Sequence, residues 1–173
     1  MSPLLALLMA SAALSMTAGT VSAQDQADLS PLLDGFVKGC VFGEPLSDLM
    51  SSLPDAALSG ADLALPQDYK SLAGKPVTEM DADGVQVFHL PLGGQWRGEA
   101  VTGLDLARGT DSGMYVAAVR FAGSSDPITA AFAPLVDESQ VVLDQQEMAT
   151  ELGHEVALTT DQGITRLLCN LST

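Results

Sequence analysis

Three stretches of the chain carry apolar residues at the three- and four-residue spacing of an amphipathic helix. Ser30-Pro31 supplies a capping residue and a proline at the first helical position, and Gly43 is the expected end of that helix. Glu44-Pro45 opens the second helix and Asp126-Pro127 opens the third. The apolar positions of the three stretches are Leu33, Phe36, Val37 and Cys40, then Leu46, Leu49, Met50 and Leu53, then Ile128, Ala131, Phe132 and Leu135.

Two prolines are expected to keep the second and third helices short. Pro54 directly follows the second apolar stripe, and Pro134 lies near the end of the third. Proline removes a backbone donor and clashes with the preceding turn, so each should end its helix. Residues 55–75 show no clean period, and we expect a loop there with one helical turn.

Most of the remaining chain has the pattern of strands separated by turn sequences. The expected strands are 77–80, 85–90, 96–106, 114–121, 141–143, 156–160 and 164–171. Asp81 to Gly84 and Asp161 to Gly163 are turn sequences that predict hairpins. Residues 91–94 are expected to break the pattern. Residues 114–121 are apolar on both faces, which predicts a central strand.

The order of these elements predicts the fold class. The strands come in runs joined by tight turns, so we expect an α+β fold with a mostly antiparallel sheet. Two or three short helices should pack against that sheet in a single domain.

The first 23 residues are predicted to be a targeting signal. Leu4 to Met16 is an uncharged apolar run of the length of a signal-peptide core, too short to cross a bilayer. Val21-Ser22-Ala23 places small residues before a cleavage site at Gln24, although no Lys or Arg precedes Lys38. The alternative is a short N-terminal membrane anchor. We expect a periplasmic or secreted protein whose domain covers residues 24–173 and does not span a membrane.

The two cysteines, Cys40 and Cys169, are expected to form one disulfide in an exported protein. In the last predicted strand Cys169 shares a face with Thr165 and Leu167, towards the helix that carries Cys40. The bridge would close a loop of about 130 residues. The alternative is two unrelated thiols, one of them reactive.

The charge of the chain constrains its partners. There are 22 acidic and seven basic residues, a formal net charge of -15, while 47% of the residues are apolar. This composition excludes a disordered acidic tail and argues against nucleic acid as a partner, because phosphate binding needs clustered cations. An acidic surface instead attracts basic proteins.

No catalytic, cofactor or metal motif stands out. The histidines are His89 and His154, and a hydrolase would use His154 with Glu155 or a nearby serine. Glu79, Asp81 and Asp83 resemble half of a calcium loop, but the position of the essential glutamate is occupied by Leu90. An EF-hand is therefore excluded, and a weak calcium site at the turn is the alternative that is left. We predict neither a cofactor nor a metal.

Trp96 and Arg97, set between glycines, are the candidate binding residues. Tryptophan and arginine dominate binding hot spots, so a loop carrying them could contact a partner. The alternative is that Trp96 packs in the core.

The sequence therefore favours an exported, acidic, non-catalytic binding or inhibitor-like module with a basic protein as partner. The alternatives are a small secreted hydrolase using His154, and a structural component of the cell envelope.

Overall fold

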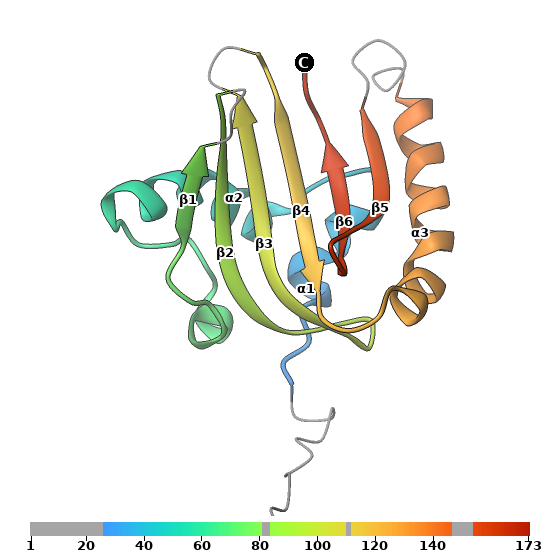
Figure 1. Cartoon of the computed structure of the whole chain (residues 1–173), viewed down its shortest axis with the longest axis horizontal. Helices are drawn as coiled ribbons and strands as arrows, with labels where there is room; N and C mark the ends of the chain where they lie inside the picture. Colours follow the sequence, from blue (N-terminus) through green and yellow to red (C-terminus); the bar gives the residue numbers. More distant parts are fainter. Residues whose placement is uncertain (1–25, 81–83, 110–111, 147–153) are drawn as a thin grey trace, which may run out of the picture.

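The computed structural model describes residues 26–80, 84–109, 112–146 and 154–173, and the predicted targeting signal lies outside them. The described residues form one six-stranded antiparallel sheet with the order β1-β2-β3-β4-β6-β5 (Figure 1). The predicted α+β class and its antiparallel sheet are thereby confirmed. The strands are β1 (Val77–Met80), β2 (Val85–Trp96), β3 (Glu99–Gly109), β4 (Tyr115–Phe121), β5 (Glu155–Asp161) and β6 (Ile164–Asn170).

The β2–β3 hairpin is longer than its sequence predicts. Strand β2 continues through residues 91–94, which were expected to break the pattern. Its pairing with β3 shifts register between Pro91 and Gly94, as at a β-bulge. Trp96 ends β2 and pairs with Glu99, so the prediction that it opens a strand was wrong. Arg97 and Gly98 form the turn with φ of 53° and 86°, the positive values that a tight hairpin requires.

Helices α2 and α3 continue through the prolines that were expected to end them. Pro54 lies within α2 and Pro134 lies within α3, and the predicted strand at 141–143 is part of α3. Buried residues follow each proline, Ala56 in α2 and Leu143 in α3. Burial of these continuing apolar faces outweighs the cost of about 3 kcal/mol for an interior proline. The helices are α1 (Ser30–Leu33), η2 (Asp34–Val37), α2 (Glu44–Ser59), η3 (Gln67–Leu72) and α3 (Ser125–Gln145).

The first helical segment is shorter than predicted. Leu29, not Ser30, is the capping position, and the 3-10 turn η2 ends at Val37. The chain then turns through Gly39 and Cys40, which both have positive φ. This turn lets Cys40 form the predicted disulfide with Cys169 of β6, 129 positions along the chain.

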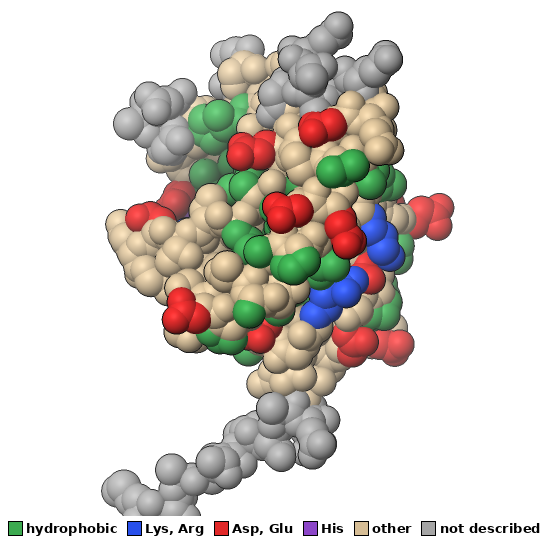
Figure 2. All heavy atoms as spheres, turned by 90° about the vertical axis from the view of Figure 1, so that its right-hand side faces the viewer, with side chains coloured by type: hydrophobic (Ala, Val, Ile, Leu, Met, Phe, Trp, Pro, Cys, Tyr) green, Lys and Arg blue, Asp and Glu red, His purple; other side chains and the backbone are tan. Residues whose placement is uncertain are grey.

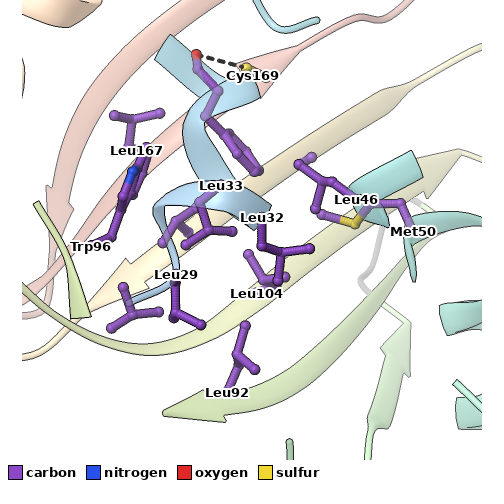
Figure 3. Close-up of a cluster of buried hydrophobic side chains, with 14 of the residues drawn as sticks. Leu29, Leu32, Leu33, Leu46, Met50, Leu92, Trp96, Leu104, Leu167 and Cys169 are labelled. Atoms are coloured by element: carbon purple, nitrogen blue, oxygen red, sulfur yellow. Dashed lines mark hydrogen bonds between the residues drawn. The ribbon is translucent and has the colours of Figure 1, made fainter. Parts of the chain in front are cut away.

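The core lies between the helices and one face of the sheet. Leucines of α1 and Met50 of α2 belong to the same buried cluster as Leu92, Leu104 and Leu167 of the strands (Figure 3). An aromatic group extends this core, with the ring of Trp96 centred 4.6 Å from Phe132 and 6.1 Å from Phe121. No helix among the described residues has the length and apolar character needed to cross a membrane.

The opposite face of the sheet has no helix over it within the described part of the chain. Figure 1 looks onto this face, and α1 and α2 are drawn behind the strands. We call it the open face.

Candidate functional site

Charged side chains from five neighbouring strands meet on the open face. His89 of β2 pairs with Asp105 of β3, and Arg120 of β4 pairs with Arg166 of β6. Glu79 of β1 completes the group at one side. We call these five residues the Asp105 cluster. Their strands are far apart in the sequence, and the sheet order brings the five side chains together.

Asp105 is the centre of the cluster and is only 7% exposed. Its Oδ1 lies 2.8 Å from His89 Nδ1 and 3.1 Å from Arg120 Nε, and its Oδ2 lies 3.6 Å from Arg166 Nε. A buried carboxylate is costly unless it is paired and hydrogen-bonded. The hydrogen bond with His89 and the ion pairs with the two arginines supply the compensation, although Arg120 Nε lacks hydrogen-bond geometry. Asp105 in turn allows two arginines to lie side by side on paired strands.

Gly103 makes room for one of these arginines. A Cβ at this position would collide with the Arg120 guanidinium and would lie 2.6 Å from the carbonyl oxygen of Leu90. The absence of a side chain therefore lets Arg120 lie along the sheet towards Asp105.

The side chains that contact His89 are both carboxylates of the cluster. Its Nε2 lies 3.1 Å from Glu79 Oε1, so the ring is placed between two carboxylates. Only a doubly protonated ring donates to both. Among the described residues no hydroxyl or thiol is hydrogen-bonded to this ring, which a nucleophile activated by it would require. The two carboxylates face opposite ring nitrogens, and no group of ligands that could hold a metal ion occurs in the described ranges.

An apolar band lies beside the cluster on the open face. The cross-strand register places one row of small and branched residues on β2, β3 and β4, and another on β4, β6 and β5. The band consists of Val87, Ala107, Val116, Ala118, Leu168 and Ala157. The open face thus combines the paired charges of the Asp105 cluster with a half-buried apolar band, in which Ala118 is only 6% exposed.

A second candidate is a groove between the start of α2 and residues 62–74. It consists of two adjoining cavities of about 240 and 350 Å³ that share Leu63, Leu65 and Lys70 in their walls. Exposed carboxylates of Glu44, Asp48 and Asp62 line it. Within the described part of the chain none of these three carboxylates forms an ion pair. We call this feature the acidic groove.

The predicted binding residues Trp96 and Arg97 are engaged within the fold. Trp96 is fully buried, as in the core alternative, so this structure exposes no ring to a partner. Trp96 Nε1 donates to Asp34 Oδ1 at 3.0 Å, and Arg97 Nη2 lies 3.1 Å from the same oxygen. Burial opposes ionisation of Asp34, but the bond from Trp96 and the charges of Arg97 and Lys38 together lower its pKa. A binding role for Arg97 stays a prediction.

His154 is buried, and its Nε2 has no hydrogen-bond partner among the residues that the structure describes. Glu155 follows it in β5 and is exposed. The segment 147–153 before His154 lies outside the described residues, as do Asp81 and Asp83 of the possible calcium turn.

Sequence reasoning noted His89 but missed the cluster around it. The only sequence signals were a histidine, an aspartate and two arginines within apolar strands. Comparisons with family models, with curated proteins and with solved structures found no match.

Proposed function

We propose that the chain is an exported, non-catalytic binding module that holds a cationic segment of a protein partner in the acidic groove. The observation that carries this proposal is that three unpaired carboxylates and apolar walls line the groove, where they outnumber its one cation, Lys70. Lysine and arginine side chains bury an aliphatic stem and keep a charged head in water. Leu63 and Leu65 suit the stem, and Glu44 and Asp48 suit the head.

Overall charge favours the same class of partner. A net charge of -15 raises the local concentration of cationic ligands and speeds their association at low salt. Most of the cations that the structure describes are already neutralised, because Asp34 pairs with Lys38 and Arg97 while Asp105 pairs with two further arginines.

Export to a periplasm or the extracellular space is part of the proposal. It is supported by the predicted targeting signal and by the disulfide, since disulfides persist in oxidising compartments. The hydrolase alternative has less support, because the ring of His154 is buried and is not hydrogen-bonded to a nucleophile among the described residues.

The test compares two variants with the same net charge. Glu44→Gln/Asp48→Asn removes two carboxylates from the groove, and Asp137→Asn/Glu138→Gln removes two exposed carboxylates from α3. Binding of a fluorescent oligo-arginine peptide to residues 24–173 is followed by anisotropy at low and moderate salt.

We expect the groove variant to bind at least about tenfold more weakly than the α3 variant, which corresponds to about 1.4 kcal/mol. Equal losses in both variants would show that the peptide responds only to net charge, and the groove proposal would then be rejected.

A further inference from the structure

Among the described residues that line the acidic groove, Lys70 is the one with a positive charge. It lines both cavities, so it lies where the two adjoin. The carboxylates are divided between the cavities, with Asp62 in the wall of one and Glu44 and Asp48 in the wall of the other. A ligand that fills the groove therefore meets the lysine as well as carboxylates.

The charge of Lys70 is not neutralised within the described ranges. Its side chain is exposed and forms no ion pair there, although three carboxylates line the same groove. Four other cations of the chain are paired, each with either Asp34 or Asp105. The groove thus offers charges of both signs to a ligand.

The backbone of the groove walls is attached to the rest of the fold. The Ala64 N–H donates to Ser52 Oγ of α2 at 2.9 Å, which ties the loop before η3 to that helix. Lys70 lies in η3, and just after η3 the Gly74 N–H donates to the carbonyl oxygen of Pro91 in β2 at 2.8 Å. A ligand therefore binds walls that are already in place, which lowers the loss of conformational freedom on binding.

Carboxylates alone do not distinguish the groove from other surfaces of this chain. Helix α3, on the surface shown in Figure 2, carries the exposed residues Asp137 and Glu138 and contains no Lys or Arg. A purely cationic segment can associate with either surface. Lys70 distinguishes them, because it repels a cation and attracts a carboxylate of the ligand. Specificity often depends on such an unfavourable contact with the wrong partner.

We propose from these observations that the acidic groove selects segments of mixed charge, in which a carboxylate lies close to the cations, and that Lys70 determines this selection. The arginine or lysine of the partner lies against the groove carboxylates, and its aspartate or glutamate lies against Lys70. The inference rests on the proposed function, because it specifies the class of cationic segment that the groove holds.

The test compares fluorescent peptides of equal length and equal net positive charge. The reference peptide contains only arginine and glutamine, and the mixed peptide has one more arginine and one glutamate in place of two glutamines. The glutamate is moved one position at a time through a series of mixed peptides. Dissociation constants are measured by anisotropy at low salt for residues 24–173 as wild type, Lys70→Gln and Lys75→Gln. Lys75 is the matched control, because it is exposed and lines neither cavity.

The quantity compared is the preference, defined as the dissociation constant of the reference peptide divided by that of a mixed peptide. At the best position of the glutamate we expect Lys70→Gln to lower the preference about threefold, as for an exposed ion pair, and Lys75→Gln to leave it unchanged. The proposal is overturned if Lys70→Gln lowers the preference no more than Lys75→Gln does at every position of the glutamate.

The two pairs of acidic variants described above separate this result from a failure of the proposed function. If Glu44→Gln/Asp48→Asn weakens both peptides more than Asp137→Asn/Glu138→Gln does, the groove binds cations. An unchanged preference in Lys70→Gln would then overturn the selection alone. If the two acidic variants lose affinity equally, the groove itself is rejected, and the selection is rejected with it.

Discussion

Loss of the Cys40–Cys169 disulfide is predicted to remove a large part of the stability of the fold. The bridge joins positions 129 apart, and the chain-entropy model assigns a loop of this size about 5 kcal/mol. Domains usually have a free energy of unfolding of about 5 to 15 kcal/mol. At about 2 to 4 °C per kcal/mol for a domain of this size, the melting temperature should fall by about 10 to 20 °C.

The assay is differential scanning calorimetry of residues 24–173 with and without a phosphine reductant. Both cysteines are buried, so reduction is carried out on the unfolded chain before refolding. The Cys40→Ala/Cys169→Ala variant should melt near the reduced wild type and should not respond to reductant. A melting temperature that reduction lowers by less than about 2 °C would refute the loop-closure argument.

Three further predictions concern stability. The pKa of Asp34 is lowered in the folded state, so its ionised carboxylate stabilises the fold. This stabilisation is fully present above the unfolded pKa near 4 and is lost as pH falls through the folded pKa. Asp34→Asn should therefore flatten the acid limb of a plot of unfolding free energy against pH, and an unchanged slope would show that its pairing with Arg97 is irrelevant. Gly103→Ala should cost about 1 to 3 kcal/mol in urea unfolding, because the added Cβ displaces Arg120. Pro54→Ala should raise the melting temperature, since alanine restores a helical backbone donor; a decrease would show that the proline is preferred there.

The elements that sequence predicted well are those governed by local patterns. The turn at Asp161 to Gly163 formed the expected hairpin, and Cys169 faces the core as the alternation of β6 implied. The errors occurred where tertiary burial outweighed a local signal. Pro54 and Pro134 are strong local breakers, but their helices continue because apolar faces beyond them are covered by the sheet.

The Asp105 cluster could not be predicted because it depends on long-range register. Arg120 reaches Asp105 only because β4 pairs with β3 in the register that sets Arg120 opposite Gly103 and Ala118 opposite Asp105. A shift of one residue would turn these side chains to the opposite face. Arg166 joins only because β6, rather than β5, lies beside β4. None of these pairings leaves a local mark in the sequence.

Strand β4 occupies the position in the sheet that its sequence pattern predicts. Its apolar residues on both faces predicted a central strand, and β4 does lie between β3 and β6. A strand with two apolar faces is stable when both faces are covered, yet helices cover only one face in the described structure. Ala118 is nevertheless only 6% exposed and Val116 is half-buried in the single chain. The cross-strand neighbours of Ala118 on the open face are Asp105 of β3 and Leu168 of β6, so the sheet itself leaves little of so small a side chain exposed.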